Sequence, residues 1–167
     1  RYGRLADIGR GIVEQRVKRP LRERLLRRLL VKVVPHPRRF GALLKLGRYA
    51  KPLLPRRVSA KVPAVRPAGQ RPSSRGNRRM IALSGCVQSV ATPATNASLA
   101  RILARLGIAL IEPPAAGCCG AAAYHLGAHR EGLDAMRRNV DVWWPHIEAG
   151  AEVVIVTASG CGAIVKE

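Results

Sequence analysis

Apolar side chains recur every three or four positions through the first part of the chain. This spacing predicts three short amphipathic helices, at residues 3–17, 20–33 and 38–50. Pro20 fits the first position of the second helix, and the Pro35-His36-Pro37 run ends it. Short amphipathic helices of this kind pack on a neighbouring domain more often than they lie on a membrane surface.

The pattern changes at Met80, where short continuous apolar runs replace the helical spacing. Such runs are typical of strands buried on both faces, and they occur at residues 80–83, 108–111 and 153–156. Helical patterns separate them, at residues 93–106 and 120–144. A break in the second is expected at Gly127 or Gly132, and Pro145 is expected to open the turn before the third strand. This order predicts an α/β fold, a three-layer Rossmann-like βαβαβ parallel sheet with helices on both faces.

Residues 55–79 show no periodic pattern. Prolines and arginines dominate them, which predicts an extended linker that makes few contacts. The chain therefore divides into a helical segment, a Pro/Arg-rich linker and a cysteine-rich domain, at residues 1–54, 55–79 and 80–167. The first residue is not methionine and the last three resemble the start of a helix, so we expect a fragment that is cut at both ends.

Charge is distributed unevenly along the 167 residues, whose net charge is +20. Residues 1–79 hold 24 Lys/Arg and 3 Asp/Glu, whereas residues 80–167 hold 6 and 7. The basic half fits an anionic membrane, an acidic partner or nucleic acid, and equally a merely soluble surface. Aromatic residues make up only 4%, which argues against base stacking, so no nucleic-acid partner is expected. No apolar run approaches the ~18 residues of a membrane span.

Four cysteines carry the candidate chemistry. Cys118 and Cys119 are adjacent and precede Gly120, while Cys86 and Cys161 stand 32 and 42 residues from the nearer member of that pair. Adjacent thiols are more naturally ligands of a metal or an iron–sulfur cluster than partners in a strained disulfide. The cysteines follow the three predicted strands, so the carboxyl edge of a parallel sheet should bring all four together. Helix N-termini predicted near Gly120 and after Cys161 would favour thiolates there.

The residue pattern alone leaves the occupant of these thiols open. Four cysteines suit an iron–sulfur cluster or a structural zinc ion, and they can also pack as small hydrophobic side chains. The cysteine content does not resemble a disulfide-dense secreted domain, so a reduced setting is expected. His125 and His129 have a spacing that can bind metal, but no acidic residue completes a metalloprotease pattern and a surface or polar-core role is favoured. Trp143 and Trp144 are interpreted as packing residues.

Several segments together resemble a known family. They are Gly85-Cys86-Val87-Gln88, Thr95-Asn96-Ala97, Ala116-Gly117-Cys118-Cys119-Gly120, Tyr124-His125-Leu126, the run from Asn139 to Pro145, and Thr157-Ala158-Ser159-Gly160-Cys161-Gly162. Their pattern is similar to the cysteine-rich CCG domain of the heterodisulfide reductase type. It is more closely similar to the iron–sulfur subunits of glycolate oxidase (glycolate dehydrogenase).

The resemblance implies an oxidoreductase subunit that transfers electrons and is not catalytic by itself. A flavin-containing partner subunit would oxidise glycolate, a 2-hydroxy acid, to glyoxylate, and the iron–sulfur subunit would pass electrons toward the membrane quinone pool. It also implies a cytoplasmic location, with peripheral contact to the inner face of the cell membrane as a further option. The two 4Fe–4S clusters usual in the family belong to a ferredoxin-like domain, whose cysteine runs this chain lacks. Residues 1–54 would follow that domain.

Ile164 marks a departure from the broader family pattern. The last cysteine of that pattern would stand there, so a non-cubane cluster with five cysteine ligands lacks one of them. Three options remain for the four cysteines: a four-thiolate 4Fe–4S cluster, zinc, or an empty site kept for structure. The last two correspond to an alternative function, a structural or docking module without electron transfer of its own.

Overall fold

Three parallel strands form the centre of the cysteine-rich part of the protein. The computed structural model describes residues 2–73 and 76–166, so the two terminal residues and positions 74 and 75 of the predicted linker lie outside the described residues. The strands are β1 (Arg78–Ala82), β2 (Ile108–Ile111) and β3 (Ala151–Ile155), and their spatial order is β2-β1-β3. β1 is therefore central, and the three carboxyl ends meet at one edge of the sheet.

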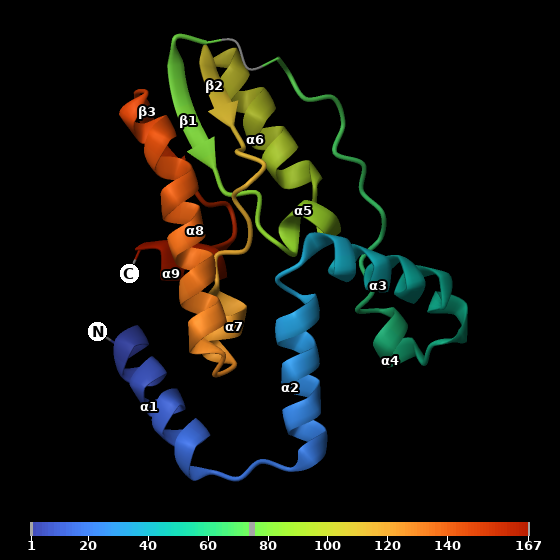
Figure 1. Ribbon diagram of the computed structural model, residues 1–167. Coiled ribbons are helices and arrows are strands. Elements are labelled where there is room, and N and C mark those ends of the chain that lie inside the picture. The colour runs from blue at the N-terminus through green and yellow to red at the C-terminus, as the bar shows by residue number, and fades with distance from the viewer. Residues whose placement is uncertain (1, 74–75, 167) are drawn as a thin grey trace.

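Helices cover both faces of this sheet (Figure 1). On one face, Trp143 of α8 (His129–Glu148) packs with Ile81, and α9 (Ser159–Lys166) adds Ile164 to the same cluster. On the other face, Leu103 of α6 (Ala94–Arg105) packs with Ala82. Ile81 and Ala82 reach opposite clusters because successive strand residues point to opposite faces. The predicted three-layer Rossmann-like α/β architecture is confirmed. The βαβαβ order that the apolar runs predicted is confirmed as well.

Two short helices, α5 (Gln88–Ala91) and α7 (Ala121–His125), follow β1 and β2. The expected break in the second helical region lies at Gly127, whose φ of 87° separates α7 from α8. Gly132 stays within α8. The prediction for Pro145 is wrong, because α8 continues through it to Glu148 and the Pro145 carbonyl accepts the Ala149 N–H at 3.0 Å.

The last helix also begins earlier than the sequence indicated. α9 starts at Ser159 rather than near residue 165, so Cys161 lies in its first turn and not in a loop before a helix. The Gly162 N–H bonds the Ala158 carbonyl at 2.9 Å, which closes a helical turn around Cys161 in spite of the surrounding glycines.

The first part of the chain folds into the three predicted helices. They are α1 (Tyr2–Arg16), α2 (Leu21–Val33) and α3 (Pro37–Tyr49), followed by a 3-10 turn, η1 (Lys51–Leu53). α3 lies beside α5 of the cysteine-rich part, where a side chain added at Gly41 would meet Val90 at 3.4 Å (Figure 1). In the part of the chain that the structure describes, no helix is both long and apolar enough to cross a bilayer.

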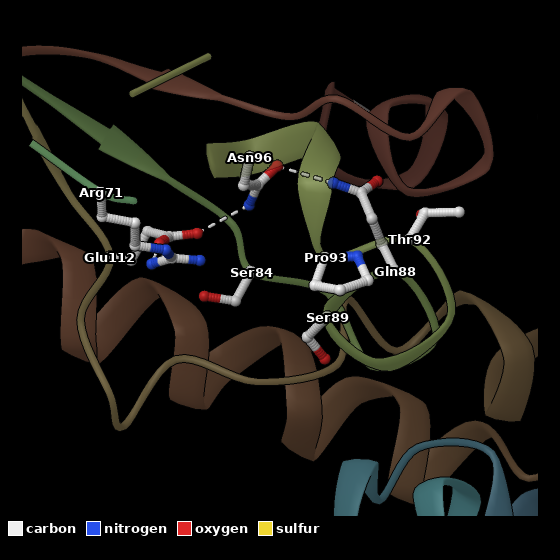
Figure 2. A pocket seen from close by; sticks show the side chains of 8 residues that line it. All are labelled: Arg71, Ser84, Gln88, Ser89, Thr92, Pro93, Asn96 and Glu112. Atoms are coloured by element: carbon white, nitrogen blue, oxygen red, sulfur yellow. Dashed lines mark hydrogen bonds and ion pairs between the residues drawn. The ribbon is translucent and has the colours of Figure 1, made fainter. Parts of the chain in front are cut away.

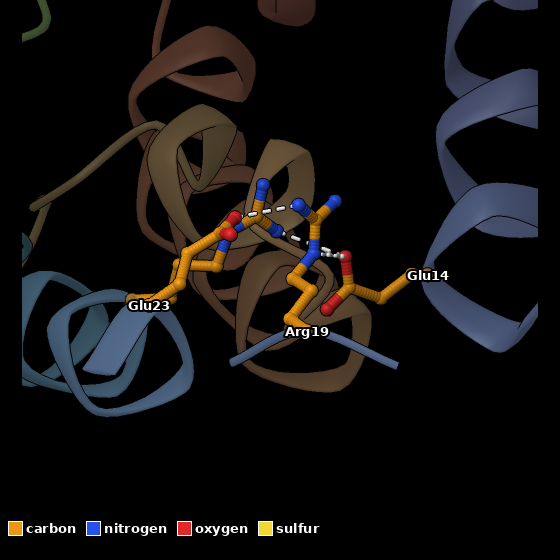
Figure 3. A network of polar contacts seen from close by, with 4 residues as sticks. Glu14, Arg19 and Glu23 are labelled. Atoms are coloured by element: carbon orange, nitrogen blue, oxygen red, sulfur yellow. Dashed lines mark hydrogen bonds and ion pairs between the residues drawn. The ribbon is translucent and has the colours of Figure 1, made fainter. Parts of the chain in front are cut away.

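Ion pairs join α1 to α2. Glu14 of α1 accepts hydrogen bonds from Arg19 at 3.1 Å and from Arg27 at 2.9 Å, and Glu23 of α2 accepts from Arg19 at 2.5 Å (Figure 3). These hydrogen bonds raise the pKa of the Arg19 guanidinium, chiefly the one with Glu14.

The remaining acidic residue of this basic half, Asp7, links α1 to the cysteine-rich part. Its carboxylate lies 2.8 Å from Arg10 and 3.0 Å from Nδ1 of His125, which ends α7. All three acidic side chains of residues 1–79 are therefore engaged in ion pairs, and this half holds far more basic side chains than acidic partners of its own.

The prediction of an extended linker over residues 55–79 is wrong at both of its ends, because β1 already begins at Arg78 and a helix lies near the start. Residues 56–59 form a short helix, α4 (Arg56–Ser59), instead of extended chain. The linker also makes more contacts than expected. Arg101 of α6 donates hydrogen bonds to the carbonyls of Ala68 and Gln70 at 3.1 and 3.2 Å, because a backbone without regular structure leaves carbonyls free to accept from nearby arginines.

Candidate metal centre

The structure brings the four cysteine side chains together at the carboxyl edge of the sheet. Cys86 lies in the turn after β1, Cys118 and Cys119 lie in the loop after β2, and Cys161 lies in the first turn of α9. Their sulfurs interact in the order Cys86, Cys118, Cys119, Cys161, and each interaction shifts the pKa of the thiols involved. All four are free thiols, and only Cys161 is less than fully buried.

Contacts among the sulfurs divide the four thiols into two pairs. The pKa of Cys118 is held below its usual range, first because Cys119 and then because Cys86 donates to its thiolate, and the pKa of Cys161 is lowered by the hydrogen bond from Cys119. The same bonds raise the pKa of Cys86 and Cys119, and burial adds to the rise. Two sulfurs thus readily carry charge, while the other two must lose protons when a metal binds.

Backbone N–H groups also point at three of the sulfurs. Gly120 donates to Cys118 Sγ at 3.5 Å, and the N–H groups of Val87 and Ala121 donate to Cys86 and Cys119 and oppose the rise in the pKa of these two thiols. Such donors stabilise the thiolate form over the thiol. The loops after β1 and β2 therefore present amide dipoles to a group that carries negative charge on sulfur.

Gly120 holds the cysteine pair close to α8. Its φ is +87°, and a side chain at this position would lie 2.4 Å from the carbonyl oxygen of Gly132. Gly132 in turn has no room for a side chain because Tyr124 of α7 lies against it, 2.9 Å from where its Cβ would be. Because Gly120 and Gly132 have no side chains, the backbones of α7, α8 and the cysteine loop can pack directly against one another.

Asn139 of α8 contacts the same loop from the inside. It is 2% exposed, its Oδ1 accepts the Gly117 N–H at 2.9 Å, and its Nδ2 donates to the Cys118 carbonyl at 2.9 Å. The sequence analysis assigned no role to this residue. A usable signal was present, because Asn139 is a polar residue in the otherwise apolar inward-facing stripe of α8, four positions before Trp143.

Trp143 was interpreted from the sequence as a packing residue only, and the structure indicates a further role. Its ring is buried in the cluster that contains Cys119, and its indole Nε1 is a buried side-chain donor that has no hydrogen-bond partner among the described residues. A buried N–H without a partner costs about 1–3 kcal/mol. Four thiols, three backbone donors and this unpaired donor together fit an anionic, sulfur-rich group such as an iron–sulfur cluster.

Among the described residues, no set of side chains is arranged as the ligands of a single metal ion. Within residues 2–73 and 76–166, no three histidine, cysteine or acidic side chains are grouped as ligands of one ion would be. The thiols follow one another along the edge of the sheet.

Comparison with known proteins places these observations in a family. Residues 81–166, which include all four cysteines, match the family described as the cysteine-rich domain, CCG. The chain belongs to the CCG family. It is 55% identical over 168 residues to the glycolate oxidase iron–sulfur subunit of Escherichia coli (strain K12), covering 100% of this chain and 41% of that protein.

A second relative is more distant. The chain is 28% identical over 194 residues to the probable glycolate oxidase iron–sulfur subunit of Bacillus subtilis (strain 168), covering 100% of this chain and 43% of that protein. The chain thus spans less than half the length of these two curated relatives. No solved structure matches it significantly.

Asn96 connects the three loops that carry the cysteines of this CCG domain. Its buried Nδ2 donates to the Leu83 carbonyl at 3.2 Å and to Glu112 at 2.8 Å, and its Oδ1 accepts from Gln88 at 2.6 Å and Thr157 at 2.8 Å. Leu83 follows β1, Glu112 follows β2 and Thr157 follows β3. Figure 2 shows Asn96 between Glu112 and Gln88, beside a cavity of about 180 Å³. The side-chain amide of Asn96 thus fixes the positions of the segments after β1, β2 and β3 relative to one another.

The histidines do not join the thiols. His125 ends α7 and interacts with Asp7 and Arg10 of α1, while His129 begins α8 and packs edge-on against Tyr124 with ring centroids 4.6 Å apart. The two histidines therefore sit on different helices. Ile164, at the position of the missing cysteine, packs against the apolar cluster around Cys119.

A cavity of about 660 Å³ opens beside Cys118 of the CCG domain. The turn between α2 and α3, at Pro35 to Pro37, forms one wall, and Arg138 of α8 forms part of another. Arg138 also lowers the pKa of Cys118 through its positive charge. The helical segment therefore shields the cysteine loop from solvent on this side.

Proposed function

We propose that this CCG domain holds an iron–sulfur cluster on Cys86, Cys118, Cys119 and Cys161 and serves electron transfer in a flavin-dependent glycolate dehydrogenase complex. The observation that carries the proposal is the convergence of four interacting free thiols at one edge of the sheet. The names of both relatives, which are iron–sulfur subunits of glycolate oxidase, support the same function. Within such a complex the domain is an oxidoreductase subunit that is not catalytic alone.

The residues of the chain have separable tasks in this function. The four cysteines would hold the cluster, which we propose to be of the 4Fe–4S type and which supplies one-electron transfer when bound. Backbone N–H groups of Val87, Gly120 and Ala121 stabilise negative charge on the sulfurs, and burial of the cysteine pair keeps water away.

The partners follow from the function. Glycolate oxidation to glyoxylate would take place on a flavin in a separate glycolate oxidase subunit, and electrons would leave toward the quinone pool of the membrane. We propose a cytoplasmic location with peripheral contact to the inner face of the membrane. The basic, acid-poor helical segment supports contact with an anionic surface, because its acidic side chains are already paired.

Metal analysis of the chain purified without oxygen tests the proposal. We expect iron and acid-labile sulfide, visible absorption in the oxidised protein, and an electron paramagnetic resonance signal in one of the two redox states. Stoichiometric zinc without iron, or no metal at all, would contradict the cluster and favour the structural or docking module.

The Cys119→Ser variant tests whether Cys119 is a ligand of the cluster. Serine is close to cysteine in size, but its hydroxyl barely ionises at neutral pH and is a poor partner for a soft metal. We expect the variant to keep its fold, lose iron and, in the complete complex, lose electron transfer to quinone. Glycolate oxidation with an artificial acceptor that takes electrons directly from the flavin should persist. Normal iron content and normal quinone reduction in the variant would exclude Cys119 as a ligand.

A further inference from the structure

We propose that Asn139 is a positioning residue, which holds the cysteine loop so that Cys118 and Cys119 can bind the same group. The inference rests on the proposed function, because it concerns the ligands of the cluster. It extends that function to a residue of α8 that lies 20 positions beyond the pair and bears no thiol of its own.

Two hydrogen bonds carry the inference. The Asn139 carboxamide accepts the N–H of Gly117 and donates to the carbonyl of Cys118, both at 2.9 Å. The first bond fixes the backbone before Cys118, and the second fixes the peptide plane between Cys118 and Cys119. Since the peptide unit is planar, the orientation of this carbonyl limits the directions in which the two thiols can point.

Only an amide side chain of this length can make both bonds. Asparagine has an acceptor oxygen and a donor nitrogen on one planar group, whereas aspartate is acceptor-only when ionised and leucine offers neither. The two backbone groups are buried with the loop, so they would lose their partners if the amide were removed. Asn139 itself is 2% exposed, which leaves little room for water to replace it.

The helix that carries Asn139 is well placed to act as a rigid support. α8 meets the cysteine loop on successive turns: Gly132 lies against Gly120, Asn139 binds the loop backbone, and Trp143 packs in the cluster with Cys119. Outer residues that orient metal ligands typically change metal affinity by 10- to 100-fold when they are removed. We therefore expect an effect of about that size at Asn139.

The experiment compares Asn139→Ala and Asn139→Asp with wild type and with Leu103→Ala, each as the complete chain reconstituted with iron and sulfide without oxygen. Leu103 lies in the apolar cluster on the opposite face of the sheet, so its truncation lowers stability without touching the cysteine loop. We expect both Asn139 variants to lose iron to a chelator about 10- to 100-fold faster than wild type and to show altered resonance spectra. Leu103→Ala should keep the wild-type rate and spectrum.

A second measurement on the metal-free chain uses alkylation of Cys118 by iodoacetamide, followed by peptide mass spectrometry. Both Asn139 variants should react faster than wild type and Leu103→Ala, because the loop is released. If Asn139→Ala does not fold, the near-isosteric Asn139→Asp variant alone tests the inference. Its ionised carboxylate cannot donate to the Cys118 carbonyl.

The outcomes separate the inference from the function on which it rests. If wild type binds no iron, the proposed function fails, and the alkylation rates alone decide whether Asn139 positions the loop. If wild type binds iron and both Asn139 variants match it in iron loss and spectrum, the inference is overturned. It is also overturned if Leu103→Ala loses iron as fast as they do, because general destabilisation then explains the effect.

Discussion

Gly120 is the residue at which the geometry of the cysteine loop is most constrained. Its backbone has φ of +87°, where side chains are disfavoured, and the space that a Cβ would occupy lies 2.4 Å from the carbonyl oxygen of Gly132. The obstacle is the backbone of a packed helix at a buried position, so it cannot rotate away as a flexible side chain could. Both causes act on the residue that directly follows the cysteine pair and donates to Cys118.

We predict that Gly120→Ala lowers the free energy of unfolding by more than the about 1–2 kcal/mol that left-handed strain alone costs. Gly107→Ala is the matched control, because Gly107 has φ of +70° but nothing within 4 Å of its Cβ position. Urea denaturation of both variants measures the difference, and iron content should fall only in Gly120→Ala. Equal destabilisation of the two variants would show that the contact with Gly132 is unimportant.

The sequence predicted the convergence of the four cysteines, but it did not predict which residues support them. Cys86, Cys118, Cys119 and Cys161 follow strands, so parallel topology alone required their convergence. The contributions of Asn139 and Asn96 depend on which backbone groups lack partners, and that is decided by tertiary packing. Local spacing shows that Asn139 is a polar residue in an apolar stripe, but it does not show which backbone groups Asn139 or Asn96 would bind. Both residues lie in the segments that carried the family resemblance.

At the scale of elements, strand pairing at the start of the sheet is reinforced by an ion pair. Arg78 of β1 donates two hydrogen bonds to the carboxylate of Glu152 on β3, at 2.8 and 2.7 Å. These bonds are the main reason why the pKa of Glu152 is lowered. They lie next to the bulge between β1 and β3, where the regular backbone ladder is interrupted.

We predict a pH-dependent contribution from this pair. Because the folded pKa of Glu152 is depressed, its stabilisation is fully present above the unfolded carboxylate value of about 4.3 and is lost as pH falls through the folded pKa. Glu152→Gln should therefore have a slightly lower Tm than wild type at pH 7, and the gap should close on acidification below about pH 4. Both side chains are exposed, so the gap should also shrink in 1 M salt. A gap that is constant with pH would contradict the role of the ion pair.

The errors of the sequence analysis are errors about where elements begin and end. Pro145 was expected to open the turn before the third strand, yet α8 runs through it to Glu148. Trp143 packs in the core just before Pro145, and the Pro145 carbonyl accepts the Ala149 N–H. Cys161 was placed in a loop because glycines flank it, but α9 begins at Ser159. In both cases tertiary contacts outweighed the unfavourable helix propensities of proline and glycine.

At the scale of the whole molecule, the helical segment and the CCG domain are distinct in charge and in task. The segment reaches the CCG domain at a few places, including α1 against His125 and α3 against α5. No described residue of the segment donates to or accepts from the four cysteine sulfurs, whose partners come from the CCG domain itself. Its nearest approach is the turn at Pro35 to Pro37, which walls the cavity beside Cys118.

We therefore predict that a chain of residues 76–167 folds and reconstitutes with the same iron content as the complete chain. Its core clusters, its cysteines and the hydrogen bonds of Asn139 and Asn96 are all retained. In the metal-free state, however, Cys118 should react faster with a bulky maleimide in the shorter chain, because one wall of the 660 Å³ cavity is gone. Circular dichroism, iron analysis and mass spectrometry of the alkylated peptide measure the three properties. A shorter chain that is unfolded, or folded but unable to retain iron, would show that the helical segment is part of the metal centre and that division of the chain near residue 80 is wrong.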